Sequence, residues 1–314
     1  MFPLPKNCRI GNVQGIKPMT YNSLEECLKN YFGDSTEIKT SLPVGGGDIN
    51  EASCLVLNNA EKVFVKSNRS DRLGFFEAEE AGLAAIKATG TLSVPEIIGK
   101  GIDEKRSIAF LMMRFVEGRQ RTGDFWSIFG CELAQMHLAG TGSFTGEGSF
   151  GFFDDNYIGA TKQINDVKDN WIDFFRECRL EPQFKMAERY FNDADIKGFV
   201  RLLDRLPDIM EEPKKPSLLH GDLWSGNFIV GTDGKAWLID PAAYVGHFEA
   251  DLAMTELFGG FREEFYRAYN EVKPVGAGYK DRKEIYNLYH LMNHLNLFGP
   301  AYLSEVLRTV RRYS

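Results

Sequence analysis

The chain has 314 residues, 43% of them hydrophobic, so it can bury a sizeable core and is long enough for two lobes or domains. Its formal net charge of −7 offers no basic surplus to neutralise a phosphate backbone, which argues against a nucleic-acid partner. No run of about 18 apolar residues exists, so we expect neither a membrane-spanning segment nor a membrane partner.

The first part of the chain predicts an extension and then a short helix. Residues 1–18 contain Pro and Gly without a regular hydrophobic period, and no function can be assigned to them. Asn22 or Ser23 then caps a helix that runs to about Tyr31, because either side chain can accept a hydrogen bond from the first helical turn.

The next stretch predicts a small antiparallel sheet. Short extended runs lie before Pro43, at Ala52–Leu57 and at Lys62–Ser67, and an Asn-Asn pair fits the turn between the last two.

A helix and two more strands complete the first third of the chain. The Ala-, Glu- and Leu-rich stretch Phe75–Thr89 predicts a helix, and Gly90 supplies its end. Strands are expected at Ile97–Gly101 and Ser107–Phe115, and the second is nearly continuous in apolar residues, which indicates burial. We therefore expect residues 19–116 to form one β-rich lobe.

Amphipathic helices dominate after Val116, and we expect residues 117–314 to form a larger, mainly helical lobe. The fold class expected is α+β, with a small antiparallel sheet lobe that carries one long helix. The segment Gly140–Gln163 has no clear period and exceeds the usual length of a connection, which favours a functional or substrate-facing role over a plain connection. The predicted helices are Asp124–Ala139, about Asp169–Asn192, Ile196–Leu206, Phe261–Tyr269, and Lys283–Arg312 in pieces.

A strand-and-loop insert interrupts the helical lobe and carries the strongest signal. It reads Leu-Leu-His-Gly-Asp-Leu-Trp-Ser-Gly-Asn-Phe-Ile-Val at residues 218–230 and Ala-Trp-Leu-Ile-Asp-Pro at residues 236–241. Phosphoryl transfer from ATP needs one carboxylate to accept the proton of the attacking hydroxyl, and an amide oxygen with a second carboxylate to hold Mg²⁺. We assign Asp222 as the base, and Asn227 and Asp240 as the metal ligands.

Chance is the alternative explanation of this set, because Asp, Asn and Gly are also common turn residues. Three polar residues at this spacing, each bounded by apolar strands, are seldom accidental. The insert therefore indicates a kinase that uses ATP and Mg²⁺.

Glycines and a lysine of the β-rich lobe fit the nucleotide. Gly45, Gly46, Gly47 and Asp48 lie between two strands, where backbone without side chains can approach phosphate groups closely. The stretch matches neither a Walker loop nor Gly-x-Gly-x-x-Gly, so a plain hairpin turn is the alternative. Lys66 follows in an apolar strand, where a solvated lysine is the alternative.

Two further features extend this nucleotide-binding interpretation. Glu77 or Glu79 on the next helix lies where kinases pair the lysine with a carboxylate to hold it on the phosphates. Residues 111–117 are expected to be the hinge between the lobes, with a buried core strand as the alternative. The candidates for backbone and apolar contact with the adenine are Met113, Arg114, Phe115 and Val116.

Three longer motifs surround the proposed base and metal ligands. They are His-Gly-Asp-Leu-Trp-x-Gly-Asn at residues 220–227, Ile-Asp-Pro-Ala at residues 239–242, and Glu-x-Asp-Leu-Ala-Met-Thr-x-Leu-Phe-Gly-Gly-Phe at residues 249–261. Together they resemble the fructosamine kinase (ketosamine 3-kinase) family, a branch of the aminoglycoside-phosphotransferase-like kinases in the protein-kinase-like superfamily. The resemblance runs from about Tyr21 to near the C-terminus.

This resemblance implies a two-lobed protein-kinase-like fold and ATP-dependent phosphorylation of a ketosamine at its O3 hydroxyl. Fructosyl-lysine and ribulosyl-lysine, free or protein-bound, are the acceptors implied. In that family the 3-phosphate destabilises the adduct and releases the amine, which is a deglycation repair.

The resemblance also implies roles for residues around the base. The pattern Phe-x-Ala-Glu-x-x-Gly-Leu at residues 76–83 places the partner of Lys66 at Glu79 and leaves Glu80 as a solvated neighbour. Asp251 resembles the buried aspartate that braces the catalytic loop through backbone N–H groups. His220 is expected to support the loop rather than to take part in the chemistry.

On the acceptor side, Trp224 follows the base by two residues. Its indole is suited to stack on a sugar-derived group, and core packing is the alternative. Residues 148–151 and 155–159, with Asn165, resemble the family as well and are expected to border the acceptor.

Two other functions stay open at this point. A kinase for another small hydroxyl compound, such as an aminoglycoside, choline, homoserine or methylthioribose, would use the same residues. A catalytically inactive nucleotide-binding scaffold is disfavoured, because the lysine, both acids, the amide and the helix glutamate are all present. The chain lacks the Phe-Gly and Ala-Pro-Glu motifs of protein kinases, so a regulated activation loop is not expected.

The five cysteines are odd in number, scattered and never spaced as Cys-x-x-Cys, which argues against a disulfide framework and a zinc site. The basic residues near the N-terminus precede no apolar stretch, so no secretory signal is visible. We therefore expect a cytoplasmic protein.

Overall fold

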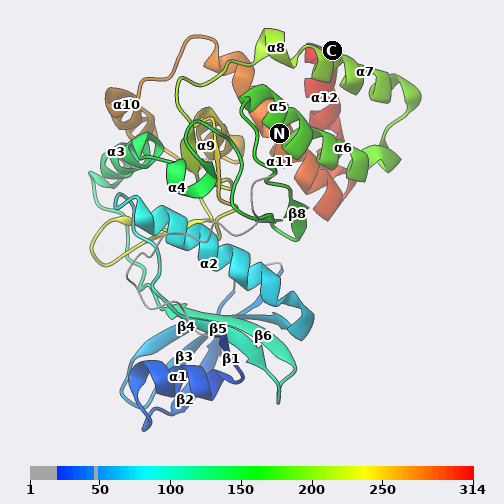
Figure 1. Cartoon of the computed structure of the whole chain (residues 1–314). Helices are drawn as coiled ribbons and strands as arrows, with labels where there is room; N and C mark the ends of the chain where they lie inside the picture. Colours follow the sequence, from blue (N-terminus) through cyan, green and yellow to red (C-terminus); the bar gives the residue numbers. More distant parts are fainter. Residues whose placement is uncertain (1–19, 46–48) are drawn as a thin grey trace.

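The computed structural model describes residues 20–45 and 49–314, which form a smaller lobe built on a sheet and a larger, mainly helical lobe. Helix α2 (Leu73–Ala88) lies between the sheet and the larger lobe (Figure 1). The α+β, two-lobed fold class expected from the sequence is confirmed.

Six strands form the sheet of the smaller lobe, in the spatial order β1-β5-β6-β4-β3-β2. β1 pairs with β5 in parallel, and all other neighbours are antiparallel. The strands are β1 (Thr20–Tyr21), β2 (Ile38–Pro43), β3 (Glu51–Leu57), β4 (Lys62–Arg69), β5 (Ile97–Asp103) and β6 (Ile108–Arg114).

Both faces of this sheet are covered, one by helix α1 (Leu24–Phe32) and the other by α2 (Figure 1). Successive side chains of a strand point to opposite faces. In β6, Phe110 and Met112 pack on the side of α1, whereas Leu111 and Met113 pack on the side of α2. An interior strand buried on both faces can be apolar throughout, which explains the nearly continuous apolar run.

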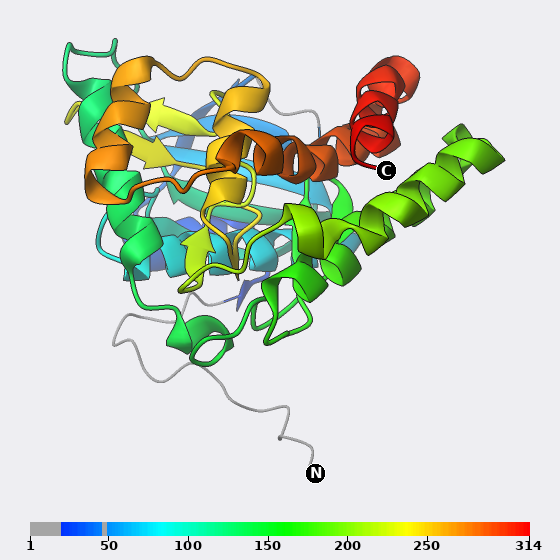
Figure 2. The same ribbon diagram turned by 90° about the horizontal axis from the view of Figure 1, so that it is seen from above.

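In the larger lobe, α3 packs on α10 and α9 packs on α11. α12 packs on α7 at the end of the lobe that lies far from the sheet (Figures 1 and 2). The helices are α3 (Phe125–Leu138), α4 (Gly142–Thr145), α5 (Trp171–Phe175), α6 (Glu181–Ala187), α7 (Asp193–Asp204), α8 (Leu206–Ile209), α9 (Glu249–Leu257), α10 (Glu263–Val272), α11 (Tyr279–Phe298) and α12 (Leu303–Tyr313).

Three short two-stranded sheets lie among these helices. The pairs β9–β12 and β10–β11 frame the two segments that carry the candidate base and metal ligands, and the hairpin β7–β8 lies beside them. The strands are β7 (Asn156–Ile158), β8 (Thr161–Gln163), β9 (Ser217–Leu219), β10 (Phe228–Val230), β11 (Ala236–Leu238) and β12 (Tyr244–Gly246).

The predicted strands and most of the predicted helices are present, and Ser23 rather than Asn22 accepts the capping hydrogen bond of α1, from the N–H of Glu26 at 3.1 Å. The helix expected near 169–192 is broken into α5, a π-helical turn at Arg176–Leu180, α6 and a 3₁₀ turn at Glu188–Tyr190.

Two other segments differ from expectation. Residues 140–163 contain α4 and the β7–β8 hairpin instead of only irregular chain, because three-residue strands are too short to show a period. Helix α9 was not predicted from the sequence. Within the described residues, no helix combines the length and the apolar character that crossing a bilayer requires.

Candidate active site

The loop that carries Asp222 leaves β9 through a tight turn. Gly221 has a φ of +82°, and a Cβ atom there would lie 2.0 Å from the carbonyl oxygen of Ala242. Only glycine fits such a close approach at this conformation. The turn therefore holds the loop directly against the segment that follows Asp240.

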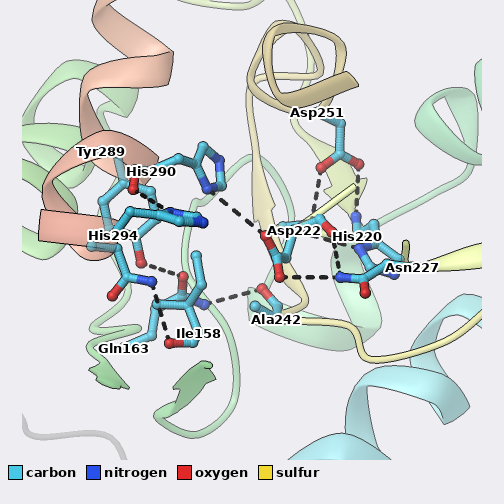
Figure 3. Close-up of polar contacts among 12 residues, drawn as sticks. Ile158, Gln163, His220, Asp222, Asn227, Ala242, Asp251, Tyr289, His290 and His294 are labelled. Carbon is cyan, nitrogen blue, oxygen red and sulfur yellow. Dashed lines mark hydrogen bonds and ion pairs between the residues drawn. The ribbon is translucent and has the colours of Figure 1, made fainter. Parts of the chain in front are cut away.

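Asp251, on α9, fixes this turn from behind. Its carboxylate accepts hydrogen bonds from the N–H of His220 at 2.7 Å and of Gly221 at 2.9 Å (Figure 3). It also accepts one from Nε2 of His137 at 3.2 Å. Burial alone would raise the pKa of Asp251, but these hydrogen bonds and the nearby histidines hold it below its ordinary value. Asp251 is therefore a charged residue that stabilises the turn through its hydrogen bonds.

His220 connects the loop to the second acidic segment. Its Nδ1 accepts the N–H of Asp222 at 3.3 Å, so its Nε2–H donates to the carbonyl of Ile239 at 2.9 Å. Burial lowers the pKa of His220, which favours the neutral ring, and the two hydrogen bonds set its tautomer. The imidazole thereby ties the backbone of Asp222 to the residue before Asp240.

Asp222 and Asn227 face each other across the loop. The Nδ2 of Asn227 donates to the backbone oxygen of Asp222 at 2.8 Å and to its Oδ2 at 3.1 Å (Figure 3). The side chain of Asp222 is 21% exposed, and burial raises its pKa to about 7 even though Asn227 lowers it. A carboxylate with a raised pKa is a better proton acceptor than an ordinary aspartate.

The two lobes meet at Asp240. This residue has a φ of +55°, a conformation that is unfavourable for non-glycine residues and is often found at functional sites. Its Oδ1 contacts the Nζ of Lys66, which also donates to Oε1 of Glu79 at 2.6 Å. Residues 66, 79 and 240, which lie far apart in the sequence, thus form one cluster.

Helix α2 approaches this cluster closely. A Cβ atom on Gly82 would lie 2.9 Å from Cγ of Pro241, so the helix that carries Glu79 packs directly on the segment that carries Asp240. Glu77, the other candidate partner of Lys66, is 52% exposed and points to Lys100 instead. The distance between the Nζ of Lys100 and Oε1 of Glu77 is 3.5 Å.

One expectation about this helix is wrong. Glu80 is not a solvated neighbour: its Oε2 lies 2.6 Å from the Nζ of Lys100, and its side chain is only 13% exposed. Successive residues of a helix point about 100° apart, so Glu79 and Glu80 reach lysines on different strands.

The remaining nucleotide candidates are placed as follows. Gly45 has open space where a Cβ would project, whereas Gly46, Gly47 and Asp48 lie outside the described residues. The Met113 side chain is buried on the side of the sheet that α2 covers.

The structure also places the three hinge residues after Met113. The Arg114 guanidinium lies on the opposite side of the sheet, 5.1 Å from the ring of Phe32, so its side chain faces away from Lys66. Phe115 donates its N–H to the carbonyl of Lys62 at 3.4 Å, and Val116 is half-buried in the linker. Contact of these residues with an adenine stays a prediction.

Trp224 is 38% exposed, so the core-packing alternative does not hold. The indole folds over Gly226, where a Cβ would lie 2.3 Å from its Cη2, and it meets the Phe258 ring edge-on at 6.4 Å. Phe258 in turn lies 4.9 Å from the His294 ring. A row of rings thus begins two residues after Asp222, with Trp224 and Phe258 exposed and His294 half-buried.

The expected acceptor loops are placed mainly by packing. Asn165 accepts a hydrogen bond from the buried guanidinium of Arg179 at 2.8 Å and donates to the backbone of Asp154, and Phe150 is buried in the core. The hairpin β7–β8 comes near the smaller lobe, since the ring of Tyr157 stacks on that of Phe75 at 3.8 Å.

Sequence reasoning missed a polar group on the other side of Asp222. Helix α11 contributes Tyr289, whose O–H donates to Oε1 of Gln163 at 2.7 Å, and Gln163 donates to the carbonyl of Ala242 at 3.0 Å (Figure 3). The same helix brings Nδ1 of His290 to 4.0 Å from Oδ1 of Asp222. The spacing of His290 and His294, one helical turn apart, is the signal that could have found this face.

Comparison with known proteins agrees with this site. The family model of fructosamine kinase matches residues 20–314. The chain belongs to the fructosamine kinase family.

Relatives of the fructosamine kinase family cover nearly the whole chain. A protein from Synechocystis sp. with the name "Probable ketoamine kinase" is 39% identical over 296 residues, 94% of this chain and 97% of its own length. The chloroplastic protein-ribulosamine 3-kinase of Arabidopsis thaliana is 40% identical over 283 residues, 90% of this chain and 84% of its own length.

Solved structures show the same likeness. A crystal structure from Haemophilus somnus with the name "Putative fructosamine-3-kinase" superposes with a TM-score of 0.82 at 30% identity and covers 93% of this chain and 96% of its own. A spectinomycin phosphotransferase with bound ADP and spectinomycin reaches a TM-score of 0.52 at 16% identity, covering 95% of this chain and 94% of its own. The second likeness shows that this chain shares the fold of that phosphotransferase.

Proposed function

We propose that this chain transfers the γ-phosphoryl group of ATP to the O3 hydroxyl of a ketosamine such as fructosyl-lysine or ribulosyl-lysine. The observation that carries the proposal is the cluster of Lys66, Glu79 and Asp240 at the junction of the lobes. The loop with the Asp222–Asn227 pair is connected to this cluster, because His220 bonds to the backbone of Ile239, the residue before Asp240. Membership of the fructosamine kinase family and the ribulosamine 3-kinase relative support the choice of acceptor.

Asp222 is the proposed general base. It accepts the proton of the acceptor hydroxyl as that oxygen attacks the γ-phosphorus, and its raised pKa favours proton acceptance. His220 and Asp251 are proposed to hold the loop, because Asp251 accepts the backbone N–H groups of His220 and Gly221, and the ring of His220 bonds to the backbone of Asp222 and Ile239. This rigidity keeps the carboxylate fixed while the proton moves.

The residues present fit a magnesium ion. Among the described residues no group of three or more His, Cys, Asp or Glu side chains could hold a metal alone. Mg²⁺ is usually bound by one or two carboxylates together with phosphates and water, so such a protein cage is not needed. Asn227 uses its Nδ2 within the loop and leaves Oδ1 for a cation, and Asp240 already faces the ammonium of Lys66. When bound, the ion would neutralise charge on the phosphates.

Lys66 is proposed to hold the α- and β-phosphates of ATP, with Glu79 fixing its position. The side chains of both are nearly enclosed, at 11% and 12% exposure, so the pair is little weakened by solvent. The glycine-rich stretch and the linker residues from Met113 to Val116 are proposed to cover the phosphates and the adenine.

For the acceptor, the exposed indole of Trp224 offers an apolar surface to a sugar-derived group beside Asp222. Phosphorylation at O3 would then destabilise the adduct and release the amine.

A panel of acceptors tests this proposal. The protein is incubated with ATP, Mg²⁺ and, separately, fructosyl-lysine, ribulosyl-lysine, an aminoglycoside and choline, and the position of the phosphate is determined by NMR. We expect a 3-phosphate on a ketosamine. Transfer to the aminoglycoside or choline with none to the ketosamines would contradict the proposed acceptor.

The variant Asp222→Asn tests the base. We expect kcat to fall by about a thousandfold while the affinity for ATP changes no more than a few-fold, because a base acts mainly on the transition state. Asp208→Asn, at an exposed aspartate of α8, is the matched control and is expected to leave kcat unchanged. Near-normal turnover of Asp222→Asn would show that another group accepts the proton.

A further inference from the structure

The imidazole of His290 carries a polar atom that no other described residue bonds. His290 is 4% exposed, and its Nδ1 has no hydrogen-bond partner among residues 20–45 and 49–314. The nearest acid is Asp222, whose Oδ1 lies 4.0 Å away (Figure 3). Buried polar atoms are nearly always hydrogen-bonded, so an unpaired one beside a candidate base suggests that a ligand completes it.

His290 and Asp222 do not form a direct hydrogen bond with each other. A nitrogen–oxygen hydrogen bond is about 2.7–3.2 Å long, so 4.0 Å is too far. The neighbours of His290 are engaged elsewhere: the O–H of Tyr289 donates to Gln163, and Nδ1 of His294 donates to the backbone oxygen of His290 at 2.8 Å. Burial lowers the pKa of His290 to about 3, which keeps the ring neutral.

A hydroxyl group is the ligand that suits this nitrogen. A neutral imidazole nitrogen donates or accepts according to its tautomer, and a hydroxyl can do the converse in either case. The spacing fits two hydroxyls on adjacent carbons, whose oxygens are about one hydrogen-bond length apart. If one of them bonds to Oδ1 of Asp222, the other can bond to Nδ1 of His290, because each contact then has ordinary length.

We propose that His290 binds the hydroxyl next to the one that Asp222 activates, so that the two side chains together select a vicinal diol in the acceptor. The inference rests on the proposed function, in which the acceptor is a sugar-derived ketosamine. In an open-chain ketosamine C2 is the carbonyl carbon, so for phosphorylation at O3 the hydroxyl bound by His290 is the one on C4. Acceptors with a single hydroxyl, such as choline, lack this second contact.

The test crosses two proteins with two acceptors. Wild type and His290→Leu are assayed with a ketosamine that the wild type phosphorylates and with its 4-deoxy analogue, and KM for ATP is measured in parallel. We expect either change alone to lower kcat/KM for the acceptor by about ten- to hundredfold, because each leaves one polar partner unsatisfied. Together they should cost little more than one alone, since the same hydrogen bond is removed.

His290→Asn is the rescue variant. Its amide nitrogen or oxygen lies near the position of Nδ1, so we expect it to recover most of kcat/KM for the ketosamine and to distinguish the 4-deoxy analogue again. KM for ATP and the melting temperature should stay near the wild-type values in all variants. If His290→Leu does not fold, His290→Gln, which carries the amide beyond the Nδ1 position, replaces it and should lose the discrimination.

Three results would overturn the inference. If the loss of kcat/KM in His290→Leu and the loss with the 4-deoxy analogue multiply when combined, His290 acts without touching the C4 hydroxyl. A loss of kcat/KM in His290→Asn as large as in His290→Leu would show the same. A wild type that phosphorylates no ketosamine would remove the proposed function and this inference with it. A wild type that is active on the ketosamine, with multiplying losses, would remove the inference alone.

Discussion

Two lysine–glutamate pairs of the smaller lobe are nearly identical, and only one belongs to the candidate site. Lys66 on β4 meets Glu79, and Lys100 on β5 meets Glu80, each at 2.6 Å between nitrogen and oxygen. The exposed fractions of the side chains are 11% and 12% in the first pair and 14% and 13% in the second. Distance and burial therefore do not distinguish a candidate catalytic pair from a structural one.

The third partner makes the difference. Lys66 also contacts Asp240, which comes from the larger lobe, whereas the additional neighbour of Lys100 is Glu77 on the same helix. β6 separates the two strands, and consecutive residues of α2 reach to either side of it. The comparison suggests that a pair gains a function when it bridges to a second, independently positioned acid.

Replacing each of the two lysines should give the largest difference between the two pairs. We expect Lys66→Met to lower kcat/KM for ATP by about a hundredfold or more, because the phosphates lose a preorganised cation. Lys100→Met, the matched control, should stay close to wild type. Steady-state kinetics with varied ATP measures both, and equal losses in the two variants would show that the contact with Asp240 does not set the lysines apart.

The glutamates give a smaller effect of the same kind. In Glu79→Gln the ammonium of Lys66 keeps only one carboxylate, Asp240, and is drawn away from the phosphates. We expect kcat/KM for ATP to fall by about tenfold. Glu80→Gln should leave it unchanged, and a loss there as large as in Glu79→Gln would contradict the separation of the two pairs.

Much of the fold could be predicted from the sequence because its signals are local. Alternation, helix caps and Gly stops fix the strands and helices of the smaller lobe, and the apolar continuity of β6 correctly indicates an interior strand. Helix α9 was missed because seven of its nine residues are buried, from Glu249 to Thr255, so it carries no amphipathic period.

The site was predictable where a motif lies on one loop, and less so where helices far apart meet. Asp222, Asn227 and Asp240 fall within 19 residues of sequence, and the structure places them on adjacent segments. Glu80 and His290 were misjudged or missed because their partners, Lys100 and Asp222, are supplied only by tertiary packing. His137 could not be predicted, because nothing in the sequence around a single histidine on an apolar helix face indicates that it contacts a buried acid, here Asp251.

Lys66→Met and Lys100→Met should differ in activity but not in their effect on stability. Each of Lys66→Met and Lys100→Met leaves a nearly enclosed carboxylate unpaired, so we expect each to lower the free energy of unfolding by about 1–2 kcal/mol. Thermal unfolding of both variants beside wild type measures this. A melting temperature that falls in Lys66→Met alone would mean that its kinetic loss reflects unfolding rather than a missing phosphate contact.

Asp103 of the smaller lobe shows how an ion pair away from the candidate site contributes to stability. Asp103, at the end of β5, accepts the N–H groups of Leu24 at 3.2 Å and Arg106 at 3.0 Å, and the guanidinium of Arg106 at 2.6 Å. Burial alone would raise the pKa of Asp103, but these donors hold it below its ordinary value.

A carboxyl whose pKa is lower in the folded than in the unfolded state stabilises the fold above the unfolded pKa, and this contribution is lost as the pH falls below about 4. We therefore expect Asp103→Asn to cost about 1 kcal/mol at neutral pH, with unchanged kcat, and to approach wild type in acid. Melting temperatures across this range, with the exposed Glu104→Gln as control, measure the difference. A gap between Asp103→Asn and wild type that stays constant down to the lowest pH would mean that the side chain acts through packing rather than through its charge.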